Sequence, residues 1–197
     1  MSIKELLELV SKHGLVRSRD LTLLGVTRVT LTRAVRQGHL ERIGRGLYGL
    51  PTRSLSAHTS LMEVALRVPR GVVCLLSALR FHELTTQAPY QVWLAIPHKS
   101  TAPRLDYPPL RIVRADCLRL TSGVETHIID GVQVNVFCIG RTVIDCFKFR
   151  NKIGIDVALE ALSEAWQNGR VSSDELWRYA KICRVQNIIR PYLEALL

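Results

Sequence analysis

Residues 18–49 constrain the fold of this chain more than any other stretch, because two helical patterns there precede a hairpin pattern. Apolar residues recur at helical spacing over 21–24 and again over 31–35. A Gly-Val pair at 25–26 separates the two sets. This order predicts two short helices that meet at a tight glycine turn and are followed by a β-hairpin.

The ends of these two helices carry residues that are suited to capping. Ser18 is the predicted N-cap of the first helix, because its hydroxyl can accept a hydrogen bond from a free amide of the first turn. Thr27 has the same chemistry, and Gly38 suits the left-handed position that follows a helix end. The second helix is therefore predicted to open at Thr27 and to end at Gly38.

One face of the second helix is predicted to carry side chains that read DNA. At about 100° per residue, turning Leu31, Ala34 and Val35 inward leaves the basic and hydroxyl residues outside. These residues are Val29, Thr32, Arg33 and Arg36 on the outward face, with Arg28 and Thr30 on its flanks. Arginine can pair with guanine, threonine with a base edge or phosphate, and valine with a thymine methyl group. A solvated charged surface is the alternative interpretation.

The hairpin pattern predicts contacts with the DNA backbone. Polar and apolar residues alternate over 39–43 and 47–50, and the Gly-Arg-Gly sequence at 44–46 supplies a tight turn between them. Arginines on such a hairpin typically contact sugar and phosphate, which fixes the position of the protein without reading sequence. Two arginines at the start of the first helix have the same potential. The predicted backbone contacts are Arg17, Arg19, Arg42 and Arg45.

The net charge favours a polyanionic partner. The chain has 27 Lys and Arg against 17 Asp and Glu, a formal charge of +10 and a pI of about 9.8. The first 50 residues contain nine basic and four acidic residues, so a quarter of the chain carries half of the net charge. Double-stranded DNA is the simplest partner for such a distribution.

The rest of the chain predicts a second, mixed domain. A helix over 3–12 supports the helix pair, and a stretch of small polar residues over 51–60 marks a linker. We expect a winged helix-turn-helix domain at 1–54 and a second domain at 55–197. The predicted helices of the second domain are 61–68, 72–84, one that begins at 141, 156–166, 171–183 with Ser173 as its N-cap, and a short one around Pro191. Its predicted strands are 91–96, 110–113, 124–129 and 132–136.

The predicted class is therefore α+β, with an N-terminal winged helix-turn-helix followed by a mixed α/β domain with a small sheet and C-terminal helices. The last two strands are expected to form a hairpin across Asp130-Gly131. The sequence between 97 and 109 is predicted to be a long loop.

No catalytic, metal or cofactor site is predicted. Arg141 and Asp145 share a helix face, but an ion pair or an anchor between helix and sheet explains their spacing better than catalysis. Hydrolase, metalloprotease, phosphate-loop and nuclease motifs are not found. The five cysteines form no CxxC pair and are expected to be small buried thiols. We expect this chain not to be an enzyme.

Three segments resemble the AbiEi family, the antitoxin and transcriptional-regulator half of type IV toxin–antitoxin systems. The first comprises the turn at 25–26, the helix end at 31–38 and the hairpin GHLERIGRGLYGLP at 38–51. The others are SALRFHEL at 77–84 and RTVID at 141–145, which are shorter and less specific. The resemblance covers most of the chain and leaves the loop from Pro97 to Pro109 unmatched.

This resemblance implies a repressor that binds inverted repeats at its own promoter and acts in abortive infection, a form of phage defence. It also implies a nucleotidyltransferase-like toxin, which the second domain opposes without forming a stable complex. The chain is then a monomer or a dimer that forms on DNA. Two alternatives stay open, a stand-alone regulator or protein-interaction module, and a nuclease guided by the N-terminal domain. Without a signal-peptide pattern or a membrane-length apolar run, a cytoplasmic location is expected.

Overall fold

The computed structural model describes residues 3–44, 46–51 and 58–196. Contacts between residues divide the chain into unit 1, Met1–Pro69 with His127–Val134, and unit 2, Arg70–Thr126 with Asn135–Leu197. The mixed α+β class predicted from the sequence is confirmed. The boundary predicted near residue 55 lies outside the described residues.

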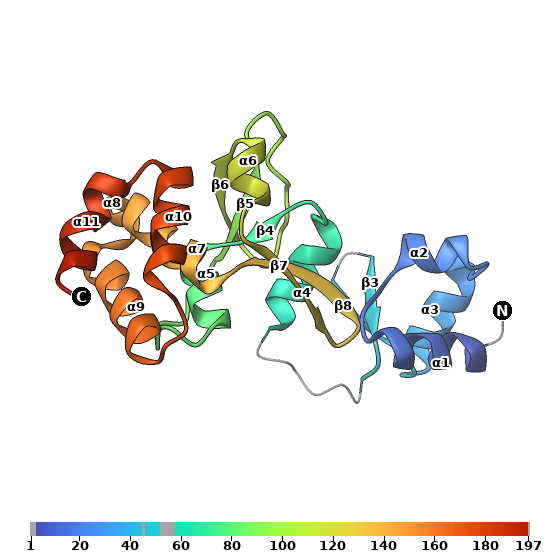
Figure 1. Ribbon diagram of the computed structural model, residues 1–197. Coiled ribbons are helices and arrows are strands. Elements are labelled where there is room, and N and C mark those ends of the chain that lie inside the picture. The colour runs from blue at the N-terminus through green and yellow to red at the C-terminus, as the bar shows by residue number, and fades with distance from the viewer. Residues whose placement is uncertain (1–2, 45, 52–57, 197) are drawn as a thin grey trace. The chain divides into compact units, whose positions relative to one another are not determined.

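Unit 1 combines short helices with a small antiparallel sheet (Figure 1). Its helices are α1 (Ile3–His13), α2 (Ser18–Leu23), α3 (Arg28–Arg36) and α4 (Thr59–Arg67). Its sheet has the order β1-β3-β2 and comprises β1 (Val16–Arg17), β2 (Glu41–Gly44) and β3 (Leu47–Gly49). The predicted hairpin is therefore present as β2 and β3, and β1 is an additional strand that the periodicity did not indicate.

The core of unit 1 follows the predicted helical stripes with one exception. Leu6 and Val10 of α1 are fully buried and pack with Leu21 and Leu31 from α2 and α3. Leu24 was expected to share the buried stripe of Leu21, but 56% of it is exposed. The reason is that α2 ends at Leu23, so Leu24 lies in the turn where helical periodicity no longer holds.

Unit 1 also includes the tip of a second hairpin, residues 127–134. The hairpin predicted across Asp130-Gly131 is present, and both residues have positive φ, 46° and 77°, the backbone that a two-residue type I′ turn requires. The tip lies against the end of α1. A Cβ atom at Gly14, where φ is +66°, would lie 1.9 Å from the Asp130 carbonyl oxygen, so both the conformation and the space require glycine there.

Unit 2 is built on a mixed five-stranded sheet of order β6-β5-β4-β8-β7. Its strands are β4 (Val72–Val73), β5 (Val92–Pro97), β6 (Leu110–Ala115), β7 (Val124–Ile129) and β8 (Val132–Phe137). β5 runs parallel to β6 and antiparallel to β4, and β4 runs parallel to β8. The four strands predicted for this region are confirmed.

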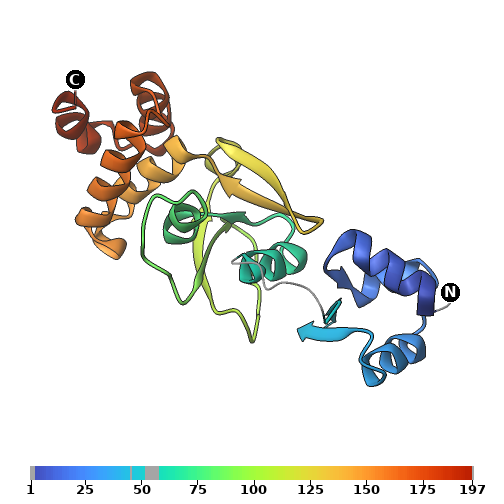
Figure 2. The same ribbon diagram turned by 90° about the horizontal axis from the view of Figure 1, so that it is seen from below.

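The helices of unit 2 pack around one buried helix. They are α5 (Leu75–Phe81), α6 (Cys117–Thr121), α7 (Ile139–Lys148), α8 (Arg150–Ile153), α9 (Ile155–Gln167), α10 (Ser173–Cys183) and α11 (Gln186–Glu194). Every residue of α7 from Gly140 to Phe147 is buried. α7 contacts α5, α9 and α10, and the helices that follow it gather beside it (Figure 1, Figure 2). This helix is therefore the centre of the main core.

Two predictions for unit 2 need correction. The stretch 72–84 is not one helix, because Val72 and Val73 form a buried central strand and the backbone turns at Leu75, whose φ is 47°. Two residues are too few to show a strand period, so this strand merged with the helical pattern after it. Helix α6 was not predicted at all, since its five residues are shorter than two turns.

Two capping residues were each misplaced by one position. The N-cap of α10 is Ser172, whose Oγ accepts from the Glu175 amide at 3.2 Å, and not Ser173. The N-cap position of α2 belongs to Arg17, which makes no side-chain cap. The Ser18 amide instead donates to the Gly46 carbonyl at 2.8 Å and so ties α2 to the hairpin. Ser172 and Ser173 are equally suitable caps by sequence, so the pattern does not distinguish them. A strand directly before α2 likewise hides the residue at which that helix begins.

Candidate nucleic-acid interface

The turn between α2 and α3 sets the direction of α3. Gly25 has a φ of +83°, and the Val26 amide donates to the Leu21 carbonyl at 2.9 Å while the Val26 side chain is buried. Thr27 then caps α3 as predicted, because its Oγ1 accepts from the Thr30 amide at 3.2 Å. α3 therefore starts at a fixed point relative to α2.

The end of α3 is equally defined. Gly38 has the left-handed backbone predicted for it, with a φ of +71°. Beyond it the His39 amide donates to the Ala34 carbonyl at 2.9 Å, which satisfies a carbonyl of the last turn. Leu40, fully buried, then anchors the chain before β2. Both ends of the helix are thus held by hydrogen bonds or buried side chains.

Packing fixes which face of α3 points outward. Leu31 and Ala34 are buried against α1 and α2, and Val35 is half-buried, as the periodicity predicted. The opposite face carries basic, hydroxyl and apolar side chains around a hollow of about 670 Å³. Its lining residues are Arg28, Val29, Thr32, Arg33, Arg36 and Gln37. Five of the predicted DNA contacts therefore share one surface, which we call the α3 face.

The α3 face is strongly basic and has no internal neutralisation. Within the described part of the chain, Arg28, Arg33 and Arg36 have no ion-pair or hydrogen-bond partner for their guanidinium groups. α3 itself contains no acidic residue. Three exposed, unpaired guanidinium groups on consecutive turns leave their donors available to an external anion such as phosphate or to a guanine edge.

The other residues of the α3 face differ in what they offer. Val29 is 68% exposed on this face, so its apolar side chain is accessible to a partner such as a thymine methyl group. The Thr32 hydroxyl donates to the Arg28 carbonyl at 2.9 Å, so its oxygen is left as an acceptor. Gln37 was missed by the sequence analysis, although it follows Arg33 by four residues and helical spacing therefore predicts the same face.

Thr30 does not belong to the α3 face. It is half-buried, and its hydroxyl lies 3.0 Å from the Thr27 hydroxyl. The physical reason is its place in the first turn, where the cap draws both threonines together. Thr30 therefore supports the start of the helix.

The β2–β3 hairpin brings a further arginine to the surface. Arg42 is exposed on β2 opposite Tyr48, and its Nε donates to the Gly44 carbonyl at 3.3 Å; among the described residues its terminal nitrogens have no hydrogen-bond or ion-pair partner. Tyr48 packs on the core of unit 1. Arg45 at the predicted tip lies outside the described residues.

The two arginines near the start of α2 differ from each other. Arg19 is exposed, and within the described residues its side chain has no partner. Arg17 belongs to β1, where its Nε lies 3.7 Å from the Asp20 carboxylate and its side chain is only 27% exposed. An internal carboxylate competes with a phosphate for this guanidinium, so Arg17 is the weaker of the two candidates.

One comparison with known proteins found a match, and it covers the part of the chain that contains the α3 face. Residues 4–51 match the family model described as transcriptional regulator, AbiEi antitoxin. This match confirms the resemblance for the segment that contains α1, the α3 face and the β2–β3 hairpin. No curated protein matched the chain. We call residues 4–51 the AbiEi segment.

Beyond the AbiEi segment, the pair formed by Arg141 and Asp145 is internal. Both side chains are almost fully buried, and Arg141 Nε donates to Asp145 Oδ2 at 3.1 Å. Arg141 Nη1 donates to the Ser122 carbonyl at 3.0 Å, and the guanidinium lies 4.4 Å from the centre of the Phe137 ring. The arginine therefore ties α7 to the chain segment between α6 and β7.

One cysteine of unit 2, Cys183, lies directly beside this pair. Burial, together with the negative charge of Asp145, raises the pKa of the Cys183 thiol to about 12, and Cys183 Sγ lies 3.4 Å from Asp145 Oδ1. Cys117 is exposed, contrary to the expectation of five buried thiols, because it lies on the first turn of the unpredicted helix α6. Among the described residues, no group of three or more His, Cys, Asp or Glu side chains is placed to hold a metal ion.

The described helices include none that is long and apolar enough to span a bilayer.

Proposed function

We propose that this chain is a DNA-binding transcriptional repressor whose residues 1–54 act as a winged helix-turn-helix. In this proposal α3 enters the major groove and the β2–β3 hairpin is the wing. The α3 face carries the proposal, because Arg28, Arg33 and Arg36 project from a helix fixed at both ends and have no partner within the described residues. The AbiEi match of the same segment supports a regulator of transcription.

The division of contacts follows from chemistry. Val29, Thr32, Arg33 and Arg36 are assigned to base edges, since all four line the α3 face and have side chains that can bond or touch bases. Arg19 and Arg42, with Arg28 at the helix start, are assigned to phosphates. A single copy reaches only a few base pairs, so two copies on an inverted repeat at the chain's own promoter complete the proposal.

The antitoxin part of the proposal is supported by the family description rather than by geometry. We propose that the chain opposes a nucleotidyltransferase-like toxin functionally, without a stable complex, in a type IV system. The proposal assigns no catalytic step to the chain, because the most suggestive pair, Arg141 with Asp145, is buried and each member satisfies the other. Growth arrest by the product of a neighbouring toxin gene, relieved by this chain, is the expected result.

A gel-shift titration with the DNA upstream of the gene tests the DNA-binding part. Arg33→Ala and Arg36→Ala should each weaken binding by about 1–3 kcal/mol, the usual value of a lost base contact. Arg178→Ala is the matched control, since Arg178 lies in unit 2 and donates to the Tyr179 hydroxyl at 3.3 Å. Wild-type affinity in both α3 variants would show that α3 is not the reading helix.

One observation favours a second function, docking to another protein. Leu23 and Leu24 at the end of α2 are 80% and 56% exposed, more than a solvated turn requires. Protein docking predicts binding that changes little with salt, whereas DNA binding weakens steeply as salt rises. The same titration at two salt concentrations separates the two functions.

A further inference from the structure

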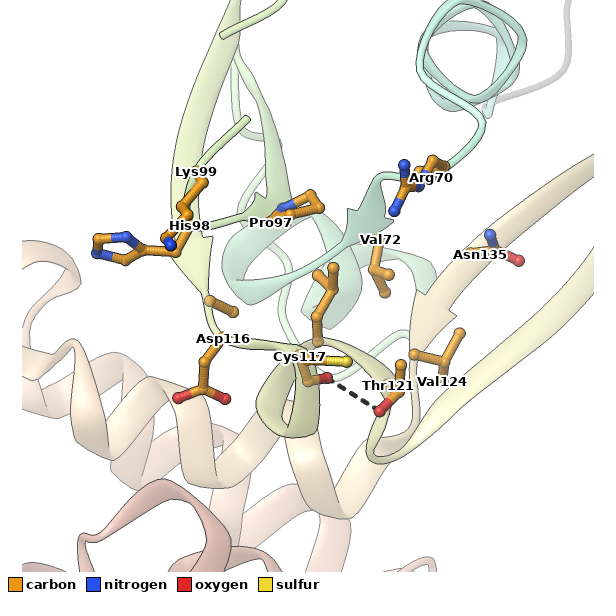
Figure 3. Close-up of a pocket in the computed structure, with 12 residues that line it drawn as sticks. Arg70, Val72, Pro97, His98, Lys99, Asp116, Cys117, Thr121, Val124 and Asn135 are labelled. Carbon is orange, nitrogen blue, oxygen red and sulfur yellow. Dashed lines mark hydrogen bonds between the residues drawn. The ribbon is translucent and has the colours of Figure 1, made fainter. Parts of the chain in front are cut away.

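Unit 2 contains a cavity that the proposed DNA-binding function does not use. Its volume is about 650 Å³, and it lies among the start of β4, the loop that follows β5, α6 and the start of β7 (Figure 3). Val72, Pro97, Leu120 and Val124 give it a largely apolar wall. The volume is within the roughly 300–1,000 Å³ that is typical of sites for small organic molecules.

Two cations stand at the rim of this cavity. Arg70 precedes β4 and Lys99 follows β5, and Figure 3 shows them on opposite sides of Pro97 and Val72. Both are exposed, and within the part of the chain that the structure describes neither has an ion-pair or hydrogen-bond partner. The apolar wall therefore has two available positive groups from separate segments.

The acidic residue that borders the cavity does not neutralise these cations. Asp116 accepts from the Arg119 amide at 2.9 Å and from Arg119 Nε at 2.6 Å, and its carboxylate points away from Arg70 (Figure 3). The hydrogen bonds from the Arg119 side chain and amide lower the pKa of Asp116 to about 2. Its charge is therefore balanced by Arg119, and the rim remains positive.

We propose that this cavity binds a small organic anion with an apolar body, an aliphatic or aromatic carboxylate. The apolar body removes the wall from water, which is the main source of affinity in such a site. The carboxylate forms charge-assisted hydrogen bonds with one of these two cations, and the positive charge of the other attracts it across the rim. An inorganic anion leaves the wall wet, and an uncharged apolar molecule leaves the two cations without a partner, so neither uses the whole site.

This site lies in unit 2 and the α3 face lies in unit 1, so its ligand binding is tested without reference to DNA. The experiment is calorimetric titration of the full chain with octanoate and with 1-naphthoate, and with 1-octanol and acetate as the probes that lack the charge or the apolar body. We expect saturable binding of one or both carboxylates and weaker binding of 1-octanol and acetate, by roughly tenfold or more.

Two variants locate the binding. The double variant Arg70→Ala, Lys99→Ala should bind the carboxylate roughly tenfold more weakly, because charge-assisted hydrogen bonds are lost. Thr121→Trp should remove binding by filling the cavity from the exposed side of α6. The control is Arg104→Ala with Arg190→Ala, which removes the same charge from exposed positions that do not line the cavity.

The titrations show whether the cavity is a binding site. Loss of affinity in the rim and filling variants, with an unchanged charge-matched control, establishes the site. The proposal is overturned if neither carboxylate binds saturably, if 1-octanol or acetate binds as tightly, or if the control variant loses as much affinity as the rim variant. Circular dichroism of each variant shows that the fold is retained.

Discussion

The arginines of α3 and Arg141 of α7 have the same side chain in opposite settings. On α3 the guanidinium groups are exposed and lack a partner among the described residues. Arg141 is 2% exposed and has a carboxylate, a carbonyl and an aromatic ring around it. A guanidinium that the fold already satisfies stabilises the fold, whereas one that is left unpaired is available to a ligand.

The comparison predicts that loss of Arg141 lowers stability, whereas loss of an α3 arginine lowers DNA binding and leaves stability almost unchanged. The largest expected effect is the loss of stability at Arg141. Arg141→Ala should lower the free energy of unfolding by about 3–5 kcal/mol, because it leaves the Asp145 carboxylate buried without its cation. Urea unfolding of the full chain measures this. Arg33→Ala, on the exposed α3 face, should change it by less than about 0.5 kcal/mol.

A paired variant sharpens the same comparison. Arg141→Met with Asp145→Leu removes both charges and should recover most of the lost stability, because a buried ion pair is often replaced by apolar side chains at little cost. A loss at Arg141→Ala no larger than at Arg33→Ala would mean that the buried pair is not the anchor of α7.

The sequence predicted that the α3 arginines point outward. It did not predict that Arg141, in contrast, is buried. Helical spacing gave the outward position of Arg33 and Arg36, since one turn of an isolated helix decides which side chains share a face. The same spacing placed Arg141 and Asp145 together but did not show that both are buried. Burial of α7 depends on its packing against α5, α9 and α10, and α5 comes from a distant part of the chain.

The errors in the sequence predictions for unit 1 also arise from contacts between separate segments of the chain. Strand β1 has two residues and exists because β3 supplies its partner, with Val16 opposite Tyr48. Sequence therefore placed Arg17 at the start of a helix, whereas tertiary pairing puts it in a sheet beside Asp20. Local caps such as Thr27 were found because their hydrogen bonds join residues three apart.

The cap of α3 predicts an effect of intermediate size. Thr27→Ala removes the acceptor for the Thr30 amide and should lower the free energy of unfolding by about 1 kcal/mol. It should also weaken DNA binding, since the first turn of α3 carries Arg28 and Val29. Urea unfolding and a gel-shift titration measure the two effects.

Thr22→Ala is the control for this cap. Among the described residues the Thr22 hydroxyl bonds only to the Ser18 carbonyl within α2, so its loss should change stability by less than about 0.5 kcal/mol. Equal effects at the two threonines would show that the Thr27 cap does not hold the helix start.

The smallest predicted effect is at Arg42, which is more constrained by the fold than the α3 arginines and less so than Arg141. Its Nε donates to the Gly44 carbonyl, while its terminal nitrogens have no partner in the described part of the chain, so the fold orients this arginine and leaves those nitrogens available to an anion. Arg42→Ala should weaken binding to all DNA sequences alike and reduce the slope of log affinity against log salt by about 1, because one phosphate contact is lost. Binding isotherms at several salt concentrations, on the upstream DNA and on a scrambled duplex, measure it. Arg33→Ala should instead reduce the preference for the upstream DNA over the scrambled duplex. If Arg42→Ala weakened binding to the upstream DNA more than to the scrambled duplex, Arg42 would contact a base edge and not a phosphate.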